Sequence, residues 1–167
     1  MSTPPVWTID AEASRLEIVY LIDGKAWRGD FGTFSGEGRF DPDAPEAAEM
    51  ELLIETDSID VGNIFGTAVA KTIDWLDVET HPTARYVLDD MTLIGDGRFR
   101  TVGTLTMRGV SHQVDGELTL NVGDVASAAG ETVFDRSLYG VGVGFTALFV
   151  TIGDPISVEF DLVARRK

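Results

Sequence analysis

The chain has 167 residues, of which 44% are hydrophobic, and its 28 acidic and 13 basic side chains give a net charge of −15. This length suits a single domain spanning residues 1–167, because it can bury one sizeable core and no linker interrupts it. The charge disfavours nucleic acids and anionic membrane surfaces as partners, and the absence of cysteine excludes disulfides, thiolate metal ligands and cysteine nucleophiles.

Alternation of apolar with polar side chains, which is typical of half-buried strands, dominates the chain. At residues 49–55, for example, Met50, Leu52 and Ile54 fall on one face. In chain order, the expected strands are residues 15–22, 27–31, 34–40, 49–55, 85–94, 99–108, 114–122, 132–138 and 156–164. Turn-forming pairs such as Asp23-Gly24 and Asp96-Gly97 separate them. We therefore expect about eight to ten strands in all.

Residues 63–75 are different, because they lack strict alternation and contain the helix-compatible run at 68–71. We expect one or two short helical turns there. Many antiparallel strands of similar length favour a sheet that closes on itself, since closure removes exposed sheet edges. The predicted fold class is therefore all-β: a single antiparallel barrel of about eight strands with one short helical segment near residues 63–75.

A barrel of this size is either filled by its own side chains or holds one small ligand. Glycines on the apolar faces of their strands bear on this choice, namely Gly36, Gly38, Gly103 and Gly116. Their missing side chains leave interior room, which favours a ligand cavity. Strand glycines also mark bulges, bends or close approach of neighbouring groups, so the sequence leaves both interpretations open.

The most informative stretch is residues 103–111, Gly-Thr-Leu-Thr-Met-Arg-Gly-Val-Ser, which combines alternation with a turn. Gly103, Leu105 and Met107 fall on one face, and a second alternating run begins at residue 114. Residues 109–112 therefore most simply join two antiparallel strands as a hairpin. This stretch resembles the G-x-L-T-[IM]-R-G-V-[ST] signature of the YceI-like family.

Further segments resemble motifs of this family in the right order, so the resemblance covers the whole chain. They are residues 7–10, 32–36 with 40–42, 57–59, 75–78 with 81–86, and 134–136 with 139–140. The chain departs from the family at residues 64–71, where many members carry an Arg-Asp pair and a His-Leu pair. The resemblance implies a lipocalin-like barrel that binds polyisoprenoids, and it also implies a homodimer.

The function that follows is physical rather than catalytic. We expect non-enzymatic binding, carriage or storage of a long apolar isoprenoid lipid, an isoprenoid quinone or a polyprenyl lipid, in the barrel interior. Each CH₂ group that is buried contributes about 0.8 kcal/mol to the free energy of binding, so we expect the tail of the ligand to supply the affinity. We expect the mouth of the barrel to set the orientation of the ligand. No cofactor is required, and no metal site is expected.

The candidate ligand-binding side chains are inward-facing strand residues together with two residues of the helical segment that could cover one end of the barrel. They are Ile18, Tyr20, Phe34, Leu52, Ile54, Phe65, Trp75, Tyr86, Leu105, Met107, Phe134 and Phe160. Apolar residues at strand spacing fill cores by default, so the group carries the prediction rather than any one member.

For the polar residues that could belong to a site, we expect structural roles rather than contact with a ligand. Arg108 lies on the outward face of its strand, where we expect an ion pair at the barrel corner rather than contact with a lipid head group. Arg136 is interpreted in the same way. His112 directly follows Ser111, and neighbours on a strand point to opposite faces, which argues against a nucleophile and base pair.

His81 carries the alternative of an enzyme. Asp74, Asp77 and Glu79 are close to it in the sequence and could join it as metal ligands, or support a hydrolase or isomerase that uses the barrel interior. Solvated carboxylates around an exposed histidine are the commoner arrangement, and neither histidine has a convincing triad or zinc ligand set. A closed, fully packed barrel acting as a structural or interaction module is a further alternative. We predict that the protein is not an enzyme.

The sequence leaves the location open. The first residues have neither the basic nor the apolar region of an export signal, so as given the chain fits the cytoplasm. It also fits a periplasmic or secreted protein whose leader has been removed. The nearly uncharged stretch at 137–153 is too short and too rich in glycine to span a bilayer, so we expect no stable membrane insertion. The expected partner is the apolar isoprenoid ligand, not nucleic acid.

Overall fold

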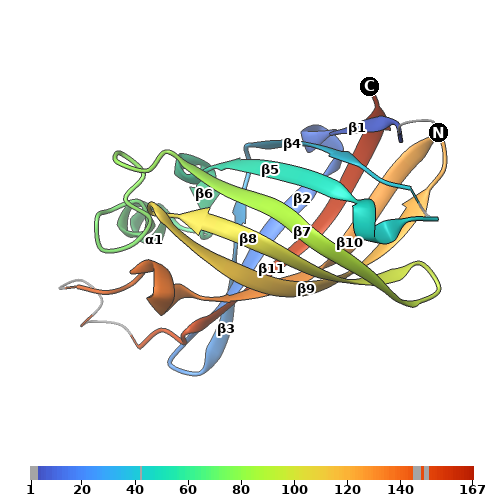
Figure 1. Ribbon diagram of the computed structural model, residues 1–167. Helices are drawn as coiled ribbons and strands as arrows, with labels where there is room; N and C mark the ends of the chain where they lie inside the picture. The colour runs from blue at the N-terminus through green and yellow to red at the C-terminus, as the bar shows by residue number, and fades with distance from the viewer. Residues whose placement is uncertain (1–3, 42, 145–147, 149–150) are drawn as a thin grey trace.

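The computed structural model describes residues 4–41, 43–144, 148 and 151–167. Within these residues the chain forms eleven strands, one α-helix and four short 3-10 helices (Figure 1). The strands are β1 Val6–Ile9, β2 Arg15–Ile22, β3 Lys25–Phe31, β4 Phe34–Arg39, β5 Glu49–Glu55, β6 Ile59–Asp60, β7 Thr83–Gly95, β8 Arg98–Met107, β9 Val110–Val122, β10 Val125–Asp135 and β11 Pro155–Arg166. The helices are α1 Ile64–Ala70, η1 Ala11–Ala13, η2 Pro45–Ala47, η3 Thr56–Ser58 and η4 Arg136–Tyr139. The predicted all-β class is confirmed.

Eight of the strands form a closed antiparallel barrel. Neighbours follow the order β1-β4-β5-β7-β8-β9-β10-β11, and β11 pairs back to β1 to close the ring. β2 also pairs with β11, and β3 and β6 continue from β2 along one side of the barrel. In Figure 1, α1 and η4 lie at one end of the barrel, while β1 and the β7–β8 and β9–β10 hairpins lie toward the other. Closure of this ring confirms the predicted barrel.

β8 shows how alternation builds the interior. Phe99, Thr101, Gly103, Leu105 and Met107 are buried in turn, and their neighbours are half-buried or exposed. Side chains that alternate along a strand point to opposite faces of the sheet, so one face of β8 lines the barrel and the other meets solvent. The inward phase predicted for residues 103–107 is confirmed.

The hairpin between β8 and β9 is tighter than predicted. β8 ends at Met107 and β9 begins at Val110, so the turn consists of Arg108 and Gly109 rather than of residues 109–112. Both turn residues have positive φ, 54° and 74°, the combination that a two-residue type I′ hairpin requires. Glycine adopts this region freely, whereas Arg108 is held there by hydrogen bonds described below.

β10 differs from the strand predicted at residues 132–138 at both boundaries. It covers Val125–Asp135, and Arg136–Tyr139 forms η4 instead. The first half of β10 is rich in alanine, serine and glycine, which have low strand propensity, and pairing with β9 and β11 on both sides makes it a strand. At its end the Asp135 carboxylate accepts a hydrogen bond from the Ser137 backbone N–H at 2.9 Å, which starts η4.

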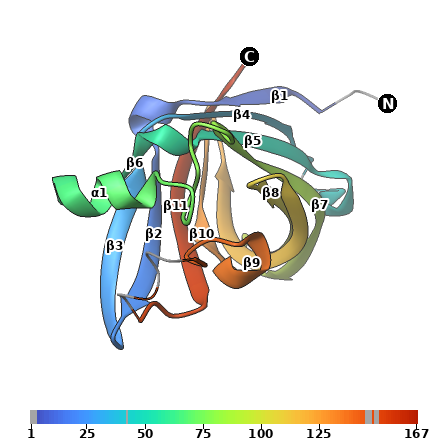
Figure 2. The ribbon, with the colours of Figure 1, turned by 90° about the vertical axis from the view of Figure 1, so that its left-hand side faces the viewer.

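The helical prediction at residues 63–75 is confirmed for its first half. The Asn63 side-chain oxygen accepts a hydrogen bond from the Gly66 N–H at 2.6 Å and so caps α1. Residues 71–76 continue as turns that bury Trp75 and Leu76. Figure 2 looks onto this end, with α1 and η4 in front of the strands. None of the helices in the described part of the chain is long and apolar enough to cross a membrane.

The two halves of the barrel are filled differently. We call the half that carries α1 and η4 the packed end; its interior is occupied by the buried side chains Trp75, Leu76, Met107, Tyr139 and Val141. We call the half that carries the β7–β8 and β9–β10 hairpins the cavity end; its smaller cluster combines Ala48, Met91 and Phe99 with the half-buried Phe40. The barrel interior is therefore solid at one end only.

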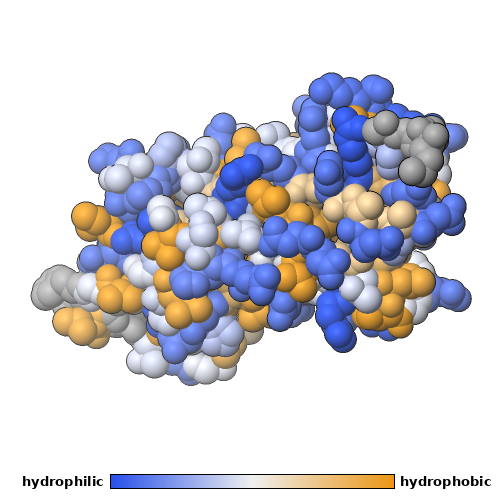
Figure 3. Space-filling view, in the orientation of Figure 1, coloured by the Kyte–Doolittle hydropathy of each residue, from blue (hydrophilic) through white to orange (hydrophobic). Residues whose placement is uncertain are grey.

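Large apolar side chains are exposed at the packed end. Hydrophilic residues cover much of the face in Figure 3, but hydrophobic ones appear at the end where α1 lies. Ile64 is 92% exposed and Phe65 is 81% exposed. Only the last turn of α1 packs against the core, through Val69 and Ala70. The expectation that Phe65 covers the end of the barrel is therefore wrong, because the first turn of α1 faces solvent.

Candidate ligand-binding cavity

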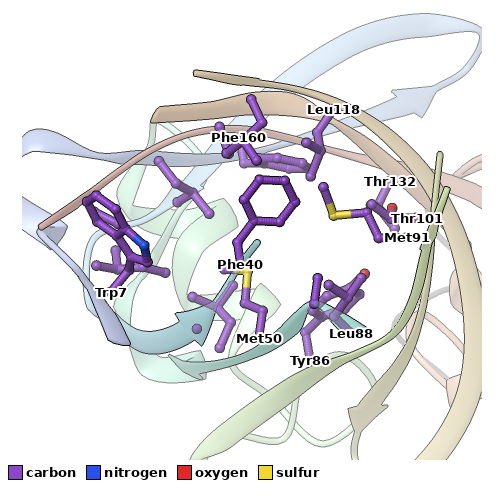
Figure 4. Close-up of a pocket in the computed structure, with 18 of the residues that line it drawn as sticks. Trp7, Phe40, Met50, Tyr86, Leu88, Met91, Thr101, Leu118, Thr132 and Phe160 are labelled. Atoms are coloured by element: carbon purple, nitrogen blue, oxygen red, sulfur yellow. The ribbon is translucent and has the colours of Figure 1, made fainter. Parts of the chain in front are cut away.

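The interior of the cavity end is an apolar cavity with a volume of about 190 Å³. All eight barrel strands contribute to its wall, and Figure 4 shows their side chains converging on one space. Of the described residues that line it, the charged ones are Glu37, Arg39 and Glu49, at the ends of β4 and β5. The cavity therefore offers an apolar molecule a dry environment.

Six of the twelve predicted ligand-binding residues line this cavity: Leu52, Ile54, Tyr86, Leu105, Phe134 and Phe160. They come from β5, β7, β8, β10 and β11, so residues distant in the sequence meet around one space. Their place on the wall follows from the inward phase of each strand. Their role in holding a ligand stays a prediction.

The other six lie away from the cavity wall: Ile18, Tyr20, Phe34, Phe65, Trp75 and Met107. Phe34, Trp75 and Met107 are buried in the core. Ile18 is half-buried against that core, and Tyr20 is half-buried opposite Trp27 of β3. Their expected position on the wall is wrong. The buried residues fill space within the core, and Ile18 and Tyr20 lie farther along β2 than Leu16, the β2 residue that does line the cavity.

Sequence reasoning missed several wall residues, among them Trp7, Phe40, Met50, Leu88, Met91 and Leu118. Phe40, Met50 and Leu118 share the inward phase of their strands, so alternation alone could have found them. Met91 is different, because β7 changes register between Leu88 and Asp90 and so turns both Leu88 and Met91 inward. A strict two-residue period places Met91 outside.

Tyr86 fills the room left by a glycine. Its ring lies over Gly103 of β8, where any side chain would meet the ring atoms. Of the two interpretations of the strand glycines, close approach of a neighbour therefore holds at Gly103. Burial raises the pKa of the Tyr86 hydroxyl, so this group is neutral near neutral pH.

Two threonines bring further hydroxyl groups to the same part of the wall. Thr101 hydrogen-bonds to the Tyr86 hydroxyl and is 2% exposed. Gly116 of β9 pairs with Thr101 on one side and with Thr132 on the other. A β-carbon on Gly116 would meet the Thr132 hydroxyl and would lie 3.0 Å from the Thr101 Oγ1. The largely apolar wall therefore contains a polar spot, and Figure 4 labels Tyr86, Thr101 and Thr132, which form it.

Aromatic side chains mark the outer part of the cavity. In Figure 4 the Phe40 ring projects into the middle of the space and Trp7 lies to one side. Phe40 packs edge-on against Phe99, with ring centroids 5.7 Å apart. The Arg166 guanidinium lies 5.3 Å from the centre of the Trp7 ring. Val122 lines the cavity and is 44% exposed, so the wall reaches the surface at the β9–β10 hairpin.

Arg108 binds backbone carbonyls. Its guanidinium donates hydrogen bonds to the carbonyl oxygens of Ile73 at 2.6 Å, Trp75 at 2.7 Å and Tyr139 at 3.2 Å. The ion pair expected at this corner is wrong, because the carbonyls of the packed end occupy the guanidinium. Arg108 thus ties the β8–β9 turn to both connections that fill the packed end.

Arg136 plays a similar part from inside the molecule. It is 8% exposed and donates to the carbonyls of residues 141–142 and 152–153 at 2.9–3.1 Å. It also pairs with the Asp154 carboxylate at 3.1 Å, although the Asp154 side chain is largely exposed. Its role is structural, as expected.

The two histidines stand apart from the cavity wall. The His81 carbonyl accepts a hydrogen bond from the Thr56 hydroxyl at 2.8 Å, and the His112 Nε2 lies 3.2 Å from the Leu138 carbonyl oxygen. The His112 ring packs edge-on against Tyr139. Within the described ranges, no group of three metal-ligating side chains is gathered. The enzymatic alternative required His81 beside the barrel interior, and His81 does not line it.

The sequence that builds this barrel matches a known family model. Residues 7–164 match the model of the YceI-like domain, from β1 into β11. This chain belongs to the YceI-like family. The resemblance found in residues 103–111 is thereby confirmed, and it extends over the whole barrel.

Bacterial relatives share this family. The UPF0312 protein of Azotobacter vinelandii is 29% identical over 111 residues, which are 65% of this chain and 58% of that protein. A UPF0312 protein of Pseudomonas aeruginosa is 31% identical over 111 residues, again 65% of this chain and 58% of that protein. The matches thus span less than two thirds of these relatives. The UPF0312 protein of Pseudomonas putida is 29% identical over 164 residues, 92% of this chain and 84% of that protein.

Several solved structures have the same fold as this chain. BcnA of Burkholderia cenocepacia superposes with a TM-score of 0.87 at 25% identity, covering 93% of this chain and 98% of that one. A polyisoprenoid binding domain from Saccharophagus degradans, implicated in plant cell wall breakdown, gives 0.76 at 17% identity, covering 96% and 98%. The Campylobacter jejuni YCEI protein gives 0.73 at 19% identity, covering 83% and 84%. These similarities confirm the lipocalin-like barrel.

Proposed function

We propose that the protein binds an apolar isoprenoid lipid in the cavity of the barrel, without catalysis, and carries or stores it. The observation that carries this proposal is the unfilled, apolar cavity end of a closed barrel. Such a space favours hydrocarbon, since each CH₂ transferred from water contributes about 0.8 kcal/mol. The description of the Saccharophagus degradans neighbour as polyisoprenoid binding supports the ligand class.

The volume of the cavity limits how much ligand it holds as it stands. An apolar protein cavity of about 150 Å³ takes up benzene, so this cavity of about 190 Å³ suits roughly ten carbon atoms, or two isoprene units. Burying them would contribute about 8 kcal/mol before ordering costs. A longer quinone or polyprenyl chain keeps one end in the cavity and requires flexible wall residues such as Phe40 and Met50 to move for the rest.

Two measurements test the proposal. Native mass spectrometry and solvent extraction of the purified protein should reveal a bound isoprenoid lipid. The extracted protein should then take up a quinone with a two-isoprene tail in a saturable titration. Absence of lipid together with absence of quinone uptake would contradict lipid binding and favour a closed structural or interaction module.

The oligomeric state is a separate proposal, supported by the family resemblance. We expect a homodimer in solution. Light scattering should give twice the chain mass of 18.1 kDa, and a single chain mass would contradict it.

A further inference from the structure

A polar spot lies on the largely apolar wall of the cavity. It consists of the hydroxyl groups of Tyr86, Thr101 and Thr132, which we call the hydroxyl cluster. We infer that the hydroxyl cluster binds a neutral oxygen atom of the ligand's head group, a hydroxyl or a carbonyl, so that the ligand lies with its head inward. The inference rests on the proposed function, because it assigns a site within the same cavity.

Three different strands bring these hydroxyls together. Thr101 of β8 and Thr132 of β10 flank Gly116 of β9, and both hydroxyls lean over that glycine. Tyr86 reaches them from β7 by crossing Gly103, and its hydroxyl hydrogen-bonds to Thr101. A side chain at either glycine would displace a member of the cluster. The two glycines therefore leave the room in which the three hydroxyl groups come together at the cavity wall.

The hydroxyl groups of the cluster have donor and acceptor sites that no described residue occupies. Each hydroxyl offers one donor and two acceptor sites. Among the described residues, Thr132 makes no side-chain hydrogen bond, and Thr101 makes only the one with Tyr86. Thr132 is half-buried and lines the cavity, so its open hydrogen-bonding capacity can serve an oxygen or nitrogen atom of a bound molecule.

The surrounding charge selects a neutral head group. The charged residues among the described lining are Glu37, Arg39 and Glu49, all at the ends of β4 and β5. No described cation lines the wall beside the cluster, so a phosphate there would be buried without a counter-charge, at a cost of several kcal/mol. A phenol, an alcohol or a quinone carbonyl carries no such cost.

The cluster lies on the inner side of the cavity. On β9, Gly116 is two residues from Val114, which belongs to the main core, and six from Val122, where the wall reaches the surface. A head group bound at the cluster therefore leaves the outer part of the cavity, around Phe40 and Trp7, to the apolar chain.

Two probes of equal carbon number separate this inference from the proposed function. 4-Butylphenol and butylbenzene both have ten carbon atoms, and only the first has a hydroxyl. The variants are Tyr86→Phe and Thr132→Val, which remove a hydroxyl with little change of shape. Thr119→Val, an exposed threonine on the outer face of β9, is the matched control. Calorimetric titration of each protein with each probe gives the affinities, and urea denaturation checks that each variant is folded.

We expect Tyr86→Phe and Thr132→Val to weaken 4-butylphenol binding by about tenfold each and to leave butylbenzene binding within about twofold of wild type. Thr119→Val should match wild type for both probes. Unchanged 4-butylphenol affinity in both cluster variants, or equal losses for both probes, would overturn the inference while leaving apolar binding intact. Failure of both probes to bind the wild-type protein would overturn the proposed function itself.

A crystal structure of the wild-type protein with 4-butylphenol tests the same point without a variant. The phenol oxygen should lie within about 3 Å of the Thr132 or Tyr86 hydroxyl oxygen. A phenol oxygen that faces Phe40 instead would overturn the inward orientation.

Discussion

The packed end and the cavity end differ in filling although the same eight strands build both. At the packed end, two connections send large side chains into the barrel: residues 71–76 bring Trp75, and η4 brings Tyr139. At the cavity end, the described residues of the connection between β4 and β5 supply Phe40 and Ala48. An eight-stranded barrel is close to the size that its own side chains can fill, so a few residues from connections decide which half is solid.

The connections that fill the packed end depend on two arginines. Irregular backbone inside a barrel has carbonyl groups that no strand satisfies, and each buried group left unpaired costs about 1–3 kcal/mol. Arg108 and Arg136 supply donors to two different sets of these carbonyls. The guanidinium suits this task because it carries five N–H donors in a fixed fork. The packed end is thus held by hydrogen bonds as well as by apolar contact.

Replacing Arg136 is the most severe way to break the packed end. Arg136→Leu removes the hydrogen bonds to four carbonyls and the pair with Asp154, so we expect the free energy of unfolding to fall by about 4 kcal/mol. Urea denaturation measures this change. Arg98→Leu is the control, since both Arg98 and its partner Glu117 are exposed, and it should cost less than about 1 kcal/mol. Similar small losses for both variants would show that the packed end stands without the guanidinium.

Shortening one methionine at each end compares how tightly the packed end and the cavity end are filled. Met107 is buried in the packed end, so Met107→Ala should lower the free energy of unfolding by about 3 kcal/mol. Met50 is half-buried and already borders empty space, so it has fewer contacts to lose and Met50→Ala should cost about 1 kcal/mol. Urea or thermal denaturation of the pair gives both values. Equal costs would mean that the two ends are packed alike.

Removing a single buried hydroxyl of the packed end should have a smaller effect. The Tyr139 hydroxyl donates to the Leu105 carbonyl at 3.0 Å, and Tyr139 is 2% exposed. Tyr139→Phe should therefore cost about 1 kcal/mol of unfolding free energy. Tyr20→Phe, on a strand outside the barrel ring, is the matched control and should change stability by less than about 0.5 kcal/mol. If the two variants are equally stable, the hydrogen bond of the Tyr139 hydroxyl does not stabilise the packed end.

The smallest expected effect concerns the start of η4. Hydrogen bonds from the Ser137 hydroxyl at 2.6 Å and backbone N–H at 2.9 Å hold the pKa of Asp135 below its ordinary value of about 3.9. A lowered pKa in the folded state stabilises the protein above the ordinary value, and this contribution is lost as pH falls through the lowered pKa. The free energy by which wild type is more stable than Asp135→Asn should thus be present at neutral pH and decline as the pH falls below the ordinary pKa of the carboxyl group. Urea denaturation across this range measures it, and a margin independent of pH would contradict this role.

Much of the fold could be predicted because alternation reports the face of a strand. The inward phase of residues 103–107 and the closed ring of strands both follow from it. Alternation does not report position along the barrel axis. Leu105 and Met107 are neighbours on one face, yet Leu105 borders the cavity and Met107 lies within the packed core. Alternation alone therefore places Phe34 and Met107 on the cavity wall, although both lie in the packed core.

The remaining differences come from tertiary contacts that local patterns do not contain. The register shift after Leu88 turns Met91 inward, and the carbonyls of the packed end hold Arg108 in a conformation that favours glycine. The hydroxyl cluster likewise requires threonines on two strands to lean over Gly116 and a tyrosine on another strand to cross Gly103. The pattern within a single strand does not show which side chains of different strands contact one another.

A pair of neighbouring alanines tests most directly whether the cavity end holds the ligand. Ala128 lines the cavity, and Ala129, the next residue of β10, is exposed on the outer surface. Ala128→Leu adds three carbon atoms to the cavity, so it should weaken uptake of a quinone with a two-isoprene tail by more than about tenfold, whereas Ala129→Leu should bind as wild type. Equal quinone affinity of the two folded variants would contradict binding in this cavity.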